Sequence, residues 1–152
     1  MGLLERLLGS RSRPRDLLSE LLEDYRAELA QAAHLRRHAE LARYPQVAAQ
    51  LRRLADAEDG HAGLLRDHIL RLGGAIPPVA PEPLPGRSQW ERAVAARTAA
   101  QEKRRRLIEH AMHWDPEEPA SASLLARIYD EDGEALGTYD DIVVRSDPHA
   151  LD

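Results

Sequence analysis

One amphipathic stretch, residues 45–72, constrains the fold more than any other part of the chain. Apolar residues recur along it every three or four positions, at Val47, Leu51, Leu54, Leu65, Ile69 and Leu72. This spacing predicts an α-helix with a single apolar face. Glu58 and His61 stand on that face, where a carboxylate needs a cation, a hydrogen-bond network or a proton to offset its lost hydration. The pair has the spacing of a salt-bridged surface pair, but it can also offer an oxygen and a nitrogen to one metal ion.

The sequence around Glu58 recurs seventy-three residues later. Residues 58–62 read EDGHA and residues 131–135 read EDGEA. Both copies place a glycine, Gly60 or Gly133, inside a predicted helix, where glycine costs about 1 kcal/mol relative to alanine. We interpret the repeat as a sign of close helix approach at both glycines, or of common descent of two halves.

Composition indicates an all-helical single domain. The chain of 152 residues is long enough to bury a core, and its apolar residues are mostly Leu and Ala, with no Phe. It has no cysteine, which excludes disulfides, thiolate zinc sites and iron–sulfur centres. The net charge of −5 is spread over interspersed acidic and basic residues, so we expect neither nucleic acid nor membrane as a partner. Residues 1–8 are too short for a signal peptide, and we expect a cytoplasmic protein.

Four helices are predicted, at about residues 15–43, 45–72, 88–114 and 120–144. Between the second and third lies a proline-rich segment, residues 73–86, which in extended form spans roughly 40 Å at about 3.1 Å per residue. A helix of about 27 residues has the same length at about 1.5 Å per residue. The segment can therefore cross the whole bundle, which predicts two antiparallel helical hairpins joined by a long crossover. We expect a tail at residues 1–14, a bundle at residues 15–145 and a second tail at residues 146–152.

Acidic residues on the other helices are candidate partners for Glu58 and His61. Glu28 lies near the centre of the apolar stripe of the first helix. On the third helix Gln101 stands at the centre of the stripe and Glu102 toward its edge, so either can face the core. On the fourth helix, Glu131 lies near the edge of the stripe and Glu134 further out.

This order of residues resembles that of ferritin-like di-metal carboxylate proteins, in particular the rubrerythrin and bacterioferritin branches. The shared pattern is a Glu on the first helix, Glu-x-x-His on the second, a long crossover, a Glu on the third and a second Glu-x-x-His on the fourth. The resemblance covers residues 16–145. It implies a ferritin-like four-helix bundle with metal ligands at Glu28, Glu58, His61, Glu102, Glu131 and Glu134. Glu134 stands where the family has its second His, so the second half of the site is altered.

The resemblance also implies a function. It predicts a metal-binding protein that holds iron, as a di-iron site, or another divalent ion, without haem. The activities it implies are ferrous-iron oxidation and peroxide reduction, and the assembly it implies is a homodimer. The alternative is a metal-free bundle with a structural or interaction role, in which Arg105 on the third helix neutralises the buried carboxylates.

Overall fold

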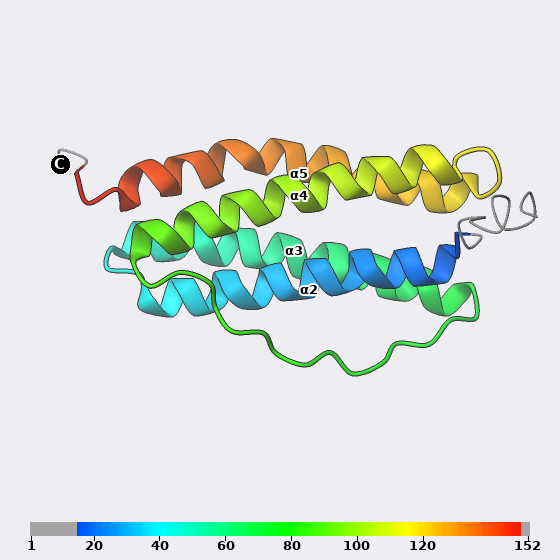
Figure 1. Cartoon of the computed structure of the whole chain (residues 1–152), viewed down its shortest axis with the longest axis horizontal. Helices are drawn as coiled ribbons and strands as arrows, with labels where there is room; N and C mark the ends of the chain where they lie inside the picture. Colours follow the sequence, from blue (N-terminus) through cyan, green and yellow to red (C-terminus); the bar gives the residue numbers. More distant parts are fainter. Residues whose placement is uncertain (1–14, 150–152) are drawn as a thin grey trace, which may run out of the picture.

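The computed structural model describes residues 15–149, which form four long helices and no strand (Figure 1). The helices are α2 (Leu17–Leu41), α3 (Pro45–Arg71), α4 (Gln89–Trp114) and α5 (Pro119–Ser146). The predicted all-helical bundle is therefore confirmed. The predicted tail at residues 1–14 and the last three residues of the chain lie outside the described residues.

The helix ends follow from local sequence signals. Pro45 and Pro119 occupy the first turns of α3 and α5, where a missing N–H costs nothing. At the start of α4, Ser88 Oγ accepts a hydrogen bond of 3.0 Å from the backbone N–H of Glu91. After α3, Gly73 takes a φ of 82°, which glycine adopts without strain. These signals set the lengths of the helices and hence the level at which each core side chain stands.

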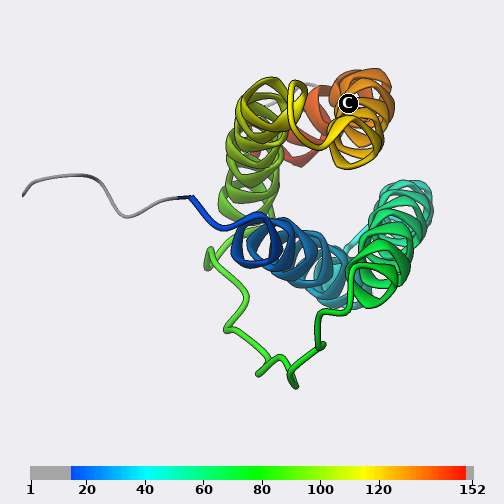
Figure 2. The same ribbon diagram turned by 90° about the vertical axis from the view of Figure 1, so that its right-hand side faces the viewer.

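The crossover runs along the outside of the bundle. Figure 1 shows residues 73–88 leaving the end of α3 and reaching the opposite end of the bundle before α4 begins. Viewed end-on, α2 neighbours α4, α3 neighbours α5, and the crossover passes outside α2 (Figure 2). The helices thus form two antiparallel hairpins, α2–α3 and α4–α5. This arrangement brings one face of each of the four helices to a common centre.

The core has two apolar clusters. One contains Leu35, Ala39, Val47, Ala48, Leu51, Leu54, Ala55, Ala93, Ala100, Tyr139 and Ile142. The other contains Leu21, Tyr25, Ala62, Leu65, Ile69, Leu107, Ala111, Leu125 and Ile128. Along each helix, buried polar residues stand between the members of the two clusters. The clusters therefore shield a polar layer in the middle of the bundle.

The two hairpins are related by an offset of 74 residues on α3 and α5, one more than the sequence repeat suggests. Seven of the eight buried residues of α5 lie 74 positions after a buried residue of α3. The pairs are Val47–Ser121, Ala48–Ala122, Leu51–Leu125, Leu54–Ile128, Glu58–Asp132, Leu65–Tyr139 and His68–Ile142. An offset of 73 pairs only three of the eight. The repeat is thus out of register with the buried faces, and the counterpart of Glu58 is Asp132.

The repeated glycines do not share a role. A Cβ added at Gly60 would meet nothing within 4 Å, whereas one at Gly133 would lie 2.6 Å from a guanidinium nitrogen of Arg104. The Arg104 guanidinium lies over the Tyr129 ring at 3.7 Å. The expectation of close helix approach at both glycines is therefore wrong for Gly60, and at Gly133 the neighbour is a side chain.

Candidate metal centre

All four helices contribute to one buried polar cluster at the centre of the bundle. Its members are Glu28 from α2, Glu58 and His61 from α3, Lys103 from α4 and Asp132 from α5. None of the five residues is more than 6% exposed. Burial to this degree removes the hydration of every charge, so the groups must compensate one another.

Lys103 lies among the three carboxylates. Its Nζ donates to Glu28 Oε2 at 2.8 Å and to Glu58 Oε2, and lies 3.4 Å from Asp132 Oδ2. Burial alone would lower the pKa of Lys103, but the three surrounding carboxylates outweigh it and raise that pKa above its ordinary value. The side chain therefore stays charged. α4 supplies a cation where the family resemblance leads one to expect a carboxylate.

The pKa values of Glu28 and Glu58 shift in opposite directions. Burial, followed by the hydrogen bond with Glu58, raises the pKa of Glu28 to about 8. Burial opposes ionisation of Glu58 as well, but its hydrogen bond to Glu28 and the charge of Lys103 lower its pKa below the ordinary value. Tyr139 donates to Glu58 Oε1 at 3.1 Å and accepts from Gln31 Nε2 at 3.1 Å. Near pH 7, Glu28 is therefore protonated and Glu58 is ionised and held in place.

His61 connects the buried cluster to the surface. Its Nδ1 lies 3.3 Å from Asp132 Oδ1 and 3.8 Å from Glu28 Oε2, while its Nε2 lies 2.7 Å from Glu131 Oε2. Burial would lower the pKa of His61, but Asp132 and Glu28 outweigh it and raise the pKa to about 10. Near pH 7 both ring nitrogens therefore carry a proton; loss of the Nδ1 proton, with the Nε2 proton kept on Glu131, would turn the lone pair of Nδ1 toward the cluster.

The donor set fits one divalent metal ion. One ligand atom from each of Glu28, Glu58, His61 and Asp132 lies within 4.8 Å of the others. Three atoms of this group, Glu28 Oε1, His61 Nδ1 and Asp132 Oδ2, are buried without a hydrogen-bond partner. Carboxylate oxygens and an imidazole nitrogen suit iron, manganese and zinc. A second ion would have to share the layer with the Lys103 ammonium, and the set does not fit two ions.

The structure brings together only part of the predicted ligand set. Glu28, Glu58 and His61 meet in the cluster, and Glu131 lies beside it, half-buried, on His61. Glu102 and Glu134 are exposed on other faces of their helices, as is Gln101. Their roles as ligands have no support from this geometry, because Lys103 on α4 and Asp132 on α5 point inward instead.

Arg105 does not neutralise the cluster. It is exposed, and it forms an ion pair of 3.6 Å with Glu109 on the surface of α4. The buried cation is Lys103, two residues earlier and on another helix face. The prediction that Arg105 neutralises the buried carboxylates is therefore wrong, because Lys103 is the cation beside them.

Two members of the cluster, Lys103 and Asp132, were not among the predicted site residues. A signal for Lys103 exists, because it stands three residues after Ala100 and four before Leu107, both of which are buried. A signal for Asp132 also exists, because it lies four residues after Ile128 and seven before Tyr139 on the buried face of α5. The local EDG repeat drew attention to Glu131 instead.

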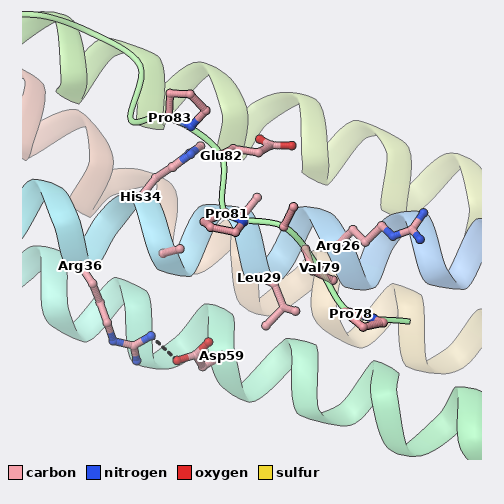
Figure 3. A pocket seen from close by; sticks show the side chains of 13 residues that line it. Arg26, Leu29, His34, Arg36, Asp59, Pro78, Val79, Pro81, Glu82 and Pro83 are labelled. Atoms are coloured by element: carbon pink, nitrogen blue, oxygen red, sulfur yellow. Dashed lines mark ion pairs between the residues drawn. The ribbon is translucent and has the colours of Figure 1, made fainter. Parts of the chain in front are cut away.

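A hollow on the surface between the crossover and α2 is separate from the cluster. A cavity of about 680 Å³ lies between the crossover and α2, with Pro78–Pro83 on one side and Leu29, Ala30 and Ala33 on the other (Figure 3). Arg36 forms an ion pair with Asp59 at its edge. No residue of the buried cluster lines this cavity. This cavity therefore gives a ligand no direct contact with the buried cluster.

Comparison with known proteins identifies the fold. No protein-family model matches the chain, and no curated protein matches it. None of the described helices is long and apolar enough to cross a membrane. Among solved structures, the chain is similar to Mycobacterium tuberculosis bacterioferritin, BfrA, with a TM-score of 0.73, 22% sequence identity and coverage of 84% of each chain. At this identity the likeness concerns the backbone, and on that ground the chain has the ferritin-like fold.

Proposed function

We propose that this protein binds a single divalent metal ion through Glu28, Glu58, His61 and Asp132. The observation that carries the proposal is the convergence of four buried ligand atoms within 4.8 Å, three of the cluster's polar atoms having no hydrogen-bond partner. Unpartnered buried oxygens and nitrogens are costly, and a metal ion would satisfy them together. Iron is the first candidate, because the chain shares its fold with a bacterioferritin.

In this single-ion site, the ammonium of Lys103 stands where a di-metal site has its second ion. Two divalent ions a few ångströms apart need bridging carboxylates to offset their repulsion. Here the α4 position that reaches the layer is an ammonium bonded to Glu28 and Glu58. Adding one divalent ion while Glu28 and His61 each lose a proton leaves the total charge of the layer unchanged. Adding a second ion would leave an excess of two positive charges in a dry core.

The residues around the ion would have distinct tasks. Glu28 and His61 Nδ1 must give up protons before they bind, so metal uptake and proton release are linked. Tyr139 and Gln31 hold Glu58 in place, and the two apolar clusters keep water out. A bound iron ion would supply one electron to an oxidant. Peroxide reduction takes two electrons, so a single ion favours metal holding or one-electron ferrous oxidation over a peroxidase role.

A second candidate function is a metal-free bundle with a structural or interaction role. The observation that favours it is the same Lys103, because its contacts with three carboxylates already supply a counter-charge. With Glu28 protonated and His61 charged, the layer carries no net charge without metal. The two candidate functions differ in whether the buried oxygen and nitrogen atoms that lack hydrogen-bond partners bind a metal ion.

Metal titration decides between them. Protein purified without chelator is stripped of metal and titrated with Fe²⁺ without oxygen, and with Co²⁺, with stoichiometry read by elemental analysis. We expect one equivalent in the wild type and loss of binding in Glu58→Ala and His61→Ala. Glu102→Ala is the matched control, because Glu102 is exposed and away from the cluster. Uptake by the wild type no greater than that of the two cluster variants would leave the metal-free bundle as the function.

We also propose a homodimer. Trp90 and Met112 on α4 remain 41% and 72% exposed, which is large for apolar side chains and suits a helix that packs on a second copy. The mass of the particle in solution tests this. A monomer, or a particle of many more than two subunits, would contradict it.

A further inference from the structure

Helix α3 ends and α5 begins at the same end of the bundle (Figure 1). Residues of these two helices line a basic surface pocket. Its volume is about 500 Å³, and its lining residues are His68, Arg71, Ala120, Ser123, Leu124 and Arg127. No carboxylate lines it. A pocket walled by two guanidinium groups and no acid attracts anions.

The two arginines have different surroundings. Arg71 lies in the last turn of α3, and no carboxylate within residues 15–149 comes within 4 Å of its guanidinium. Arg127 on α5 is bonded to Glu131, with Nε 3.0 Å from Oε1. Burial, followed by the charge of Arg71, lowers the pKa of His68 below its ordinary value, and His68 Nε2 lies 2.7 Å from Ser121 Oγ. The pocket therefore presents two guanidinium groups, one of them paired with a carboxylate, beside the His68 imidazole.

The pocket is connected to the candidate metal centre by two hydrogen bonds. Arg127 contacts Glu131 Oε1, and Glu131 Oε2 lies 2.7 Å from His61 Nε2. His61 Nδ1 in turn faces Asp132 and Glu28 in the buried cluster. A change at Arg127 thus reaches a candidate metal ligand through one intervening carboxylate.

We propose that this pocket binds a dianionic tetrahedral oxyanion between Arg71 and Arg127. Guanidinium groups bind such oxyanions through paired hydrogen bonds. The ligand is phosphate, either free or as the monoester of a small organic group. The pocket is larger than a bare oxyanion and has an apolar wall at Ala120 and Leu124, which leaves room for the organic group of a monoester.

Occupation of the pocket strengthens metal binding, a consequence that rests on the proposed function. The oxyanion competes with Glu131 for Arg127, and Glu131 then bonds His61 Nε2 more strongly. A stronger hydrogen bond at Nε2 makes Nδ1 a better ligand, and the added negative charge also favours a cation nearby. Because coupling is reciprocal, metal strengthens oxyanion binding by the same factor.

Calorimetric titration of the metal-free protein tests the pocket without reference to metal. The probes are inorganic phosphate, sulfate and phenyl phosphate at constant ionic strength, with perchlorate as a monoanion control. We expect binding of the three dianions, weakened at least about fivefold in Arg71→Ala and in Arg127→Ala. Arg105→Ala, an exposed arginine on α4, should stay within twofold of the wild type. Tighter binding of phenyl phosphate than of phosphate identifies a monoester ligand, and the reverse identifies free phosphate.

Equal binding by the wild type and both pocket variants, or equal binding of perchlorate, would overturn the proposal. Both arginines are surface residues, and unchanged helical circular dichroism in the variants excludes misfolding as the cause of lost binding.

The coupling is tested by Co²⁺ titration with and without sulfate, which does not precipitate cobalt. We expect sulfate to tighten Co²⁺ binding about threefold in the wild type and to have no effect in Arg127→Ala. Absence of Co²⁺ binding would refute the proposed function and the coupling while leaving oxyanion binding as measured. Co²⁺ binding that sulfate does not change would refute the coupling alone.

Discussion

Lys103 Nζ lies 2.8 Å from Glu28 Oε2, across the interface between α2 and α4, in the middle of the bundle. The same ammonium contacts the ionised Glu58 of α3, so the two helical hairpins are joined by a charge pair that is almost completely shielded from water. Such a pair contributes little net stability when intact, but loss of one partner leaves the other charge uncompensated. The behaviour of the whole polar layer therefore depends on this one ammonium.

Removing the ammonium should destabilise the metal-free protein. In Lys103→Met a side chain of similar length replaces the cation, and the carboxylates of Glu58 and Asp132 lose their main counter-charge. We expect the free energy of unfolding at pH 7 to fall by about 3 kcal/mol, measured by urea denaturation. Arg105→Met, at an exposed ion pair, is the control and should change it by less than about 0.5 kcal/mol. A loss no larger than that of the control would mean that Lys103 is not the counter-charge.

Replacing the ammonium by a carboxylate should create room for a second ion. Lys103→Glu adds a ligand from α4 and removes the charge that opposes a second cation. We expect the stoichiometry of Fe²⁺ or Co²⁺ to rise from one to two equivalents, measured by elemental analysis after dialysis. Lys103→Gln removes the charge without adding a carboxylate, and one equivalent is expected there. Two equivalents in the wild type would refute the assignment of Lys103 to the place of the second ion.

Glu131 and Asp132 should respond differently to substitution. Asp132 is one of the four convergent ligands, whereas Glu131 contacts the outer nitrogen of His61 and, on the surface, Arg127. We expect Asp132→Ala to abolish Co²⁺ binding. Glu131→Ala should keep one equivalent and weaken affinity about tenfold, as is usual when the carboxylate behind a metal-bound histidine is lost. The d–d absorption of Co²⁺ reports both.

Glu134→Ala is the matched control for this pair, since Glu134 is exposed on the same helix. Loss of the cobalt spectrum in Glu131→Ala with retention in Asp132→Ala would reverse the two assignments.

His38 should make the protein sensitive to acid. The residue is 1% exposed, neither ring nitrogen has a hydrogen-bond partner, and burial, with the nearby charge of Arg92, lowers its pKa to about 4. Below pH 6.5 the unfolded chain takes up a proton at His38 that the folded chain does not. Stability is therefore lost as the pH falls from about 6.5 toward 4.

The size of this loss of stability follows from the lowering of the pKa of His38 in the folded protein. Between pH 7 and pH 5, His38 should remove about 2 kcal/mol of stability. Comparison of urea denaturation curves of the wild type and His38→Leu at the two pH values isolates this contribution from those of other histidines. The variant should lose about 2 kcal/mol less than the wild type on acidification. Parallel losses in both proteins would contradict the assignment.

Sequence periodicity predicted the fold and the first half of the cluster, because α3 shows its buried face clearly. Leu, Val and Ile mark that face at regular spacing, so Glu58 and His61 stand out as polar residues on it. The crossover was also predictable, because its proline content fixes an extended form whose length matches the helices. These features are local properties of the chain, and the structure confirms the resulting bundle.

The cluster residues of the second hairpin could not be predicted in the same way, because the buried face of α4 consists mainly of small or polar residues. Ala93, Ala100, Lys103 and His110 are buried there, while the large apolar residues Trp90 and Met112 of the same helix are exposed. A lysine among arginines is read as part of a solvated face unless its partners are known. Those partners come from the other hairpin, which makes the position of Lys103 a tertiary property.

The distribution of charge between the hairpins has a consequence for how they recognise each other. The α2–α3 hairpin brings Glu28, Glu58 and His61 to the middle layer, whereas the α4–α5 hairpin brings Lys103 and Asp132. Two copies of the first hairpin would face each other with four carboxylates and no lysine, although their apolar faces would be compatible. The charges of the polar layer thus favour pairing of the α2–α3 hairpin with the α4–α5 hairpin over pairing of two identical hairpins. If the chain is cut within the crossover, the two unlike hairpins should still assemble.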